Sequence, residues 1–104
     1  MRQVILDGQT GPMEDAALRE KLTGHLLARL NEYEQEGIAA RQDGPGMVLA
    51  QIGRLSGEQA VRALSGQGVL ARAAGDRVRF LIGPGVAFED LDYVQAVAAG
   101  LLEQ

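Results

Sequence analysis

The sequence has 104 residues and a mass of 11.1 kDa, which is the size of one small domain with a single core. With 46% hydrophobic and 23% charged residues, the chain is too apolar to be intrinsically disordered. A net charge of -4 disfavours nucleic acid and anionic membrane surfaces as partners, and 2 Tyr and 2 Phe are too few for a base-stacking platform.

Cysteine is absent from the sequence, which removes disulfides, thiolate nucleophiles and most structural zinc sites. The first apolar stretch, from Val4 to Leu6, is shorter than the apolar core of a signal peptide, and no run approaches membrane-spanning length. The sequence therefore predicts a cytoplasmic protein without a membrane segment.

The N-terminal third predicts a short strand followed by a long helix. Residues 3–6 suit a strand, and the glycine- and proline-containing segment 7–12 suits a turn. Acidic residues at 14 and 15 then favour the first turn of an amphipathic helix, whose leucines recur at three- and four-residue spacing. Gly37 can adopt the left-handed conformation that ends a helix, so the helix is expected to extend to that point.

Four strands and two helices are expected in the rest of the chain. Strands at 38–41 and 47–52 flank a turn at 43–46, and Ser56 with Gln59 matches a capping box that begins a short helix. Strands at 69–72 and 78–82 flank a glycine-bearing loop typical of a hairpin. A final amphipathic helix is predicted from Phe88 to the chain end.

This order of elements indicates the fold class. Helices alternate with strands, but two of the links are hairpin-like, so we predict an α+β fold of two layers. A largely antiparallel sheet should carry the helices on one face. The sequence has no internal repeat and no long linker, so residues 1–104 are expected to form a single domain.

Several segments of the second half occur in a recognisable order: Gly46–Leu49, Gly68–Arg72, Gly75–Phe80 and Phe88–Asp92. In this order and spacing they resemble the C-terminal small domain of fold-type I pyridoxal-phosphate-dependent aminotransferases. The resemblance is clearest over residues 37–104 and implies that fold in a free-standing chain. One departure is that Val86 and Ala87 stand where relatives usually place an Asn or Thr to cap the last helix.

The resemblance also implies what the chain lacks. In complete enzymes a large domain carries the lysine that forms a Schiff base with pyridoxal phosphate, whereas the only lysine here, Lys21, is predicted on an exposed helix face. Schiff-base lysines are activated by desolvation or by a neighbouring cation, and such a face offers neither. We expect no cofactor and no activity for the chain alone, and pyridoxal phosphate only if a partner chain completes the site.

Arg79 is the candidate for substrate binding, because in the resembling enzymes an arginine on the matching strand binds the substrate carboxylate. Strand alternation places Val78 and Phe80 on one face of the strand and Arg79 on the other. A surface arginine that points outward is therefore the plainer interpretation. His25 has no second histidine and no triad partner in the sequence. No catalytic residue and no metal ligand are therefore predicted.

Two functional hypotheses remain open. The first is a non-catalytic aminotransferase small-domain-like protein, either an assembly or partner-binding module or half of a split pyridoxal-phosphate enzyme. The second is a ferredoxin-like regulatory domain that senses a small molecule such as an amino acid, because strand-helix-strand-strand-helix-strand is also the order of those modules. Under the first hypothesis we expect a homodimer or a large-domain partner chain. The predicted interface is the leucine stripe of the long helix: Leu22, Leu26, Leu27 and Leu30.

Overall fold

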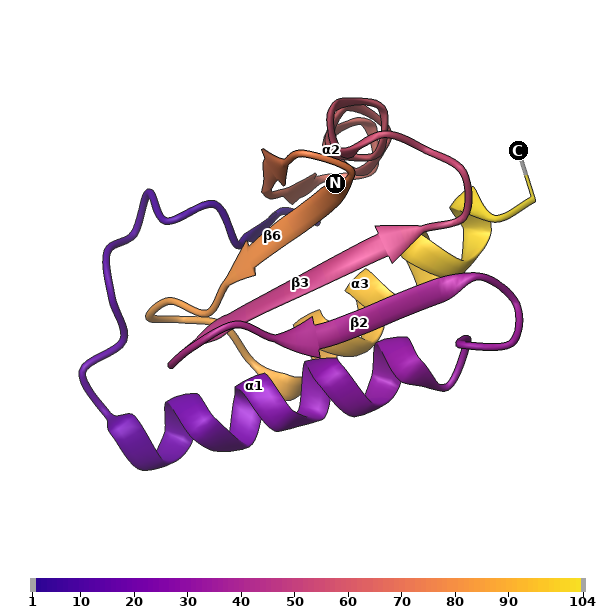
Figure 1. The fold of residues 1–104 in the computed structure, drawn as a ribbon. Helices are drawn as coiled ribbons and strands as arrows, with labels where there is room; N and C mark the ends of the chain where they lie inside the picture. Colours follow the sequence, from indigo (N-terminus) through magenta and orange to yellow (C-terminus); the bar gives the residue numbers. More distant parts are fainter. Residues whose placement is uncertain (1, 104) are drawn as a thin grey trace.

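The computed structural model describes residues 2–103 and contains three helices. The helices are α1 (Ala16–Asn31), α2 (Gly57–Gly66) and α3 (Phe88–Leu101). The strands are β1 (Val4–Ile5), β2 (Ile38–Gln42), β3 (Met47–Ile52), β4 (Val69–Leu70), β5 (Arg72–Ala74) and β6 (Arg77–Leu81). Figure 1 shows how they are arranged. None of the helices in this part of the chain has the length and apolar character needed to cross a membrane.

A four-stranded antiparallel sheet in the order β2-β3-β6-β5 forms the centre of the fold. The strand β1 pairs in parallel with β4 in a separate two-stranded sheet. The α+β fold with a largely antiparallel sheet is thereby confirmed. The ferredoxin-like alternative does not fit, because the split β-α-β arrangement needs the first strand inside the main sheet.

One face of the sheet carries the core. Val48, Ala50, Val78 and Phe80 point to this face and are each 0% exposed. They form one hydrophobic cluster with the apolar residues of all three helices, so the helices cover this face as predicted. In Figure 1, α3 runs behind the sheet, α1 lies along β2 and α2 lies beyond β6.

The N-terminal segment closes the gap between the two sheets. The Leu6 N–H donates to the Leu70 carbonyl at 2.7 Å, and the Leu81 N–H donates to the Leu6 carbonyl at 2.8 Å. Leu6 thus lies between β4 and the end of β6 and is itself buried. The loop that follows it is held against the end of the main sheet.

The last helix ends at Leu101 and several strand ends shift by a residue, but two elements differ more from the sequence prediction. The helix α1 ends at Asn31 instead of near Gly37, and Tyr33 accepts the closing backbone hydrogen bonds of the intervening turns. Gly37 has a φ of 122°, so glycine still serves to end the segment. The strand predicted at 69–72 divides in two: its first half is β4, which pairs with β1, whereas Arg72 begins β5, which extends to Ala74 and pairs with β6.

The leucine stripe of α1 needs a correction. Leu22 is 1% exposed, Leu26 and Leu30 are 0% exposed, and Leu27 is partly buried against the same core. The stripe packs on the chain's own sheet and on α3, so it is not a surface on which a second copy could dock. An amphipathic pattern shows that a helix face is covered, but it does not show what covers it.

Candidate functional site

The face of the sheet opposite the helices carries a row of arginines. The register pairs Arg41 with Leu49, Leu49 with Arg79, and Arg79 with Arg72, so one row crosses all four strands. Arg77 lies two residues before Arg79 on β6 and therefore points to the same face. We call the surface formed by Arg41, Arg72, Arg77, Arg79 and Leu49 the arginine face.

No acidic side chain balances these charges within the sheet. The sequences of β2, β3, β5 and β6 contain no Asp or Glu, although the whole chain has 14 acidic and 10 basic residues. Among the described residues, none of the four arginines of this face forms a salt bridge. A positively charged patch therefore stands on a chain whose overall charge is negative.

Arg79 is the least satisfied member of the arginine face. It is half-buried, and its Nε atom is buried without a hydrogen-bond partner in residues 2–103. Its neighbour Arg72 donates from Nε to the Asp7 carbonyl at 2.7 Å. Like charges directly opposite each other on adjacent strands are destabilising, so this pair lowers the stability of the isolated chain. Such an arrangement suits an anion or a carboxylate brought by another molecule.

The centre of the arginine face is apolar. Leu49 is 7% exposed but lies outside the main hydrophobic core. Half-buried Met47 and Leu81 form the next row of the same face, because they are paired in the register between β3 and β6. Arginine and methionine around a buried apolar centre are enriched in protein–protein interfaces.

The other residues considered from the sequence lie away from this face. Lys21 is exposed on α1, so it is not the enclosed amine that a Schiff base with pyridoxal phosphate requires. The described residues contain no group of three or more His, Asp or Glu side chains that could hold a metal ion.

His25 belongs to a polar network between α1 and α3. Its Nε2 lies 2.8 Å from Asp92 Oδ1, and Arg29 Nε lies 3.0 Å from the same oxygen. The hydrogen bond with His25, together with the positive charge of Arg29, lowers the pKa of Asp92 below its ordinary value. Gln95 is 6% exposed and completes the network by donating to the Arg29 carbonyl at 2.9 Å. Arg29 Nε makes only its ion pair with Asp92 and no hydrogen bond within the described residues, but the other polar groups of the network have partners, which is typical of a structural contact between helices.

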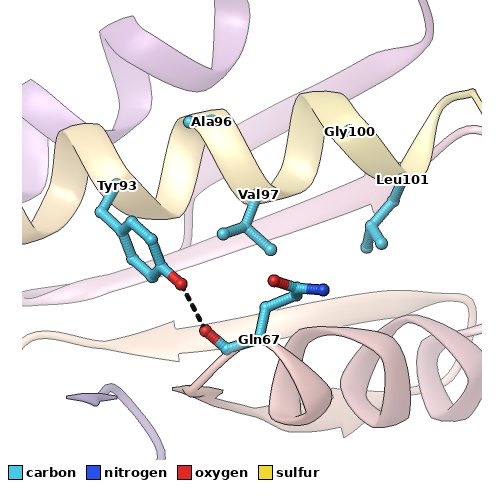
Figure 2. A pocket seen from close by; sticks show the side chains of 6 residues that line it. All are labelled: Gln67, Tyr93, Ala96, Val97, Gly100 and Leu101. Carbon is cyan, nitrogen blue, oxygen red and sulfur yellow. Dashed lines mark hydrogen bonds between the residues drawn. The ribbon is translucent and has the colours of Figure 1, made fainter. Parts of the chain in front are cut away.

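A groove of about 360 Å³ lies between α3 and the end of α2. Figure 2 shows Tyr93, Val97 and Leu101 of α3 facing Gln67 across it. The Tyr93 hydroxyl donates to the Gln67 carbonyl at 2.6 Å. The residues that line the groove carry no charged side chain, so it offers little for catalysis.

Comparison with protein-family models finds no match, and comparison with curated proteins finds none either. Among solved structures, the chain is similar to a "putative aminotransferase" from Burkholderia pseudomallei, with 20% sequence identity and a TM-score of 0.51. The similarity covers 83% of this chain and 24% of that one, so the chain corresponds to about a quarter of its neighbour. At this identity the similarity concerns the fold, and it agrees with the aminotransferase-like architecture expected from the sequence.

The sequence indicated only part of this site. Alternation along β6 correctly separated Arg79 from the core-facing Val78 and Phe80. Arg41 and Arg72 were missed, because their place beside Arg79 depends on the strand order and not on any local motif. The lack of acidic residues in four strands was the available signal, but it gains meaning only when those strands are adjacent.

Proposed function

We propose that this chain is a non-catalytic module of the aminotransferase small-domain type, which binds a partner protein through the arginine face. The fold similarity to part of a "putative aminotransferase" supports the origin of the module. The observation that carries the binding role is the row of Arg41, Arg79 and Arg72 on a face that no helix in the described chain covers.

The partner is expected to present acidic residues around an apolar contact. Arg41 and Arg79 flank Leu49 in the strand register, so carboxylates on both sides of an apolar side chain would complement them. A second copy placed on this face by a two-fold axis would oppose one arginine row with another. A homodimer of this chain must therefore use a different surface.

In the split-enzyme version of the proposal, the partner is a chain with an aminotransferase-like large domain that supplies the Schiff-base lysine. Arg79 would then meet the substrate carboxylate after the partner closes over it. The chain alone should not retain pyridoxal phosphate. An absorbance spectrum after incubation with the cofactor and dialysis tests this, and a retained band that disappears in Lys21→Ala would contradict it.

Charge reversal on the arginine face tests the binding role. Partner proteins are captured from the native cell with the unmodified chain, purified, and titrated against it by calorimetry. Exchanging Arg41 and Arg79 for Glu should weaken binding at least tenfold, since each would replace an attraction by a repulsion. Reversal of Arg54 and Arg62, exposed arginines outside this face, is the matched control and should have little effect.

Restoration of binding makes the test specific. An acidic residue of the partner that contacts the arginine face is exchanged for lysine. This partner variant should bind the Arg79→Glu variant more tightly than the original partner does, and it should bind the unmodified chain more weakly. Equal binding by the arginine-face and control variants would overturn the proposal. So would retention of RNA or DNA by this face in place of a protein.

A further inference from the structure

A second cavity, which none of the residues of the arginine face lines, lies where the loop after β1 meets the ends of β3 and β6. Its volume is about 210 Å³. Its walls are apolar side chains, among them Met13, Leu81 and Ile82, together with three glycines, Gly8, Gly11 and Gly46. Arg19 of α1 is the one charged residue among those that line it.

The guanidinium of Arg19 has little to bind within the chain. Arg19 is half-buried, and its Nε is buried without a hydrogen-bond partner in the described residues. Its Nη1 reaches the Met13 carbonyl only at 3.5 Å, and no salt bridge involves it there. The carboxylate of Asp15, one helical turn earlier, instead accepts the Leu18 N–H at 3.1 Å. A partly buried cation is thus left without a counter-charge, which is unfavourable unless a ligand supplies one.

The backbone around the cavity positions this arginine. Gly46 has a φ of 69°, and a Cβ atom at this position would lie 2.9 Å from Arg19 Cδ. The Ile82 N–H donates to the Gly46 carbonyl at 2.8 Å, which fixes the glycine against the end of β6. The glycine therefore leaves the space in which the Arg19 stem lies beside the cavity.

We propose that this cavity binds a small monocarboxylate with a short apolar tail, whose carboxylate pairs with Arg19. An apolar cavity of about 150 Å³ holds benzene, so this one has room for roughly eight non-hydrogen atoms. Arg19 supplies the planar donor pair that a carboxylate prefers. No acidic side chain lines the cavity, so the ammonium group of an amino acid would find no counter-charge. The site therefore selects a simple carboxylic acid over the matching amino acid.

A comparison of matched ligands tests this selection. The probe is 4-methylpentanoate, and the controls are leucine, which adds the ammonium group, and 4-methylpentanamide, which removes the negative charge. Titration into the isotope-labelled chain is followed by NMR at the amides of Gly8, Gly11 and Gly46. The acid should bind with a dissociation constant of about 1 mM, and both controls should bind at least about tenfold more weakly.

Single substitutions in the whole chain identify the side chain that binds the carboxylate. Arg19→Gln should weaken binding of the acid at least tenfold, and Arg19→Lys should retain part of it because the charge remains. The matched control, Arg62→Gln on the exposed side of α2, should leave it unchanged. The proposal is wrong if about 10 mM acid moves none of the three glycine amides. It is also wrong if leucine or the amide binds as tightly as the acid, a result that needs no variant to fold.

Discussion

The two faces of the main sheet have opposite chemistry although they are made by alternate residues of the same strands. On the helix-covered face, Val48 pairs with Phe80 and both are 0% exposed. On the other face, the next row pairs Leu49 with half-buried Arg79, and Arg79 forms no salt bridge within the described residues. The covered face supplies stability, whereas the arginine face retains binding capacity that the isolated chain does not use. Adjacent residues of β6 therefore allow the two roles to be measured separately.

The largest expected effect is on the covered face. Phe80→Ala should lower the free energy of unfolding by about 3–5 kcal/mol, because it removes a fully buried ring and leaves a cavity in the hydrophobic core. Urea denaturation followed by circular dichroism measures the loss. A change below about 1 kcal/mol would show that the core closes around the missing ring or that Phe80 is not central to it.

The helices that cover this face differ in how they begin, and the second prediction uses that difference. Ser56 caps α2 by accepting the Gln59 N–H at 3.1 Å, whereas Ala87 at the start of α3 has no side chain that can cap. Asp90 accepts the Ala87 N–H at 2.8 Å, which is only half of a capping box. Ala87→Ser should therefore stabilise the chain by about 0.5–1 kcal/mol, and Ser56→Ala should destabilise it by about 1 kcal/mol.

Thermal unfolding of the two cap variants checks this prediction. They should shift the midpoint in opposite directions relative to the unmodified chain. If Ala87→Ser has no effect, the backbone N–H groups in the first turn of α3 do not need a side-chain acceptor at position 87. In that case the missing cap has less influence than the sequence indicates.

Local patterns predicted the elements and the core face better than they predicted the site. Alternation in β6 and the capping box at Ser56 are encoded within a few residues, so both could be recognised in the sequence. The row of Arg41, Arg79 and Arg72 joins strands far apart in the chain, and its existence depends on the order β2-β3-β6-β5. The α1 leucines were assigned to a dimer because periodicity identifies a buried stripe without its covering layer.

A small effect on stability is expected on the arginine face. Arg79→Leu should change the free energy of unfolding by less than about 0.5 kcal/mol, or increase it, because it removes a charge opposite Arg72 and an unpartnered buried donor. The same substitution should abolish partner binding. Denaturation and calorimetry on one preparation separate the two effects. A loss of stability comparable to that of Phe80→Ala would show that Arg79 supports the fold and is not held for a partner.

The smallest expected effect concerns the network between α1 and α3, where charges are paired within the chain. The pKa of Asp92 is lowered in the folded state, chiefly by its hydrogen bond with His25. A carboxyl with a lowered pKa stabilises the fold above its unfolded pKa of about 3.9, and this contribution is lost as the pH falls through the folded value. Asp92→Asn should therefore be less stable than the unmodified chain near neutral pH, and the difference should shrink below about pH 4.

Urea denaturation across this pH range measures the difference in stability. The control is Glu20→Gln, because Glu20 is exposed on α1 and forms no salt bridge in the described chain. A difference that stays constant with pH would mean that the contact acts through packing, and the pairing of charge that distinguishes this network from the arginine face would then contribute nothing measurable.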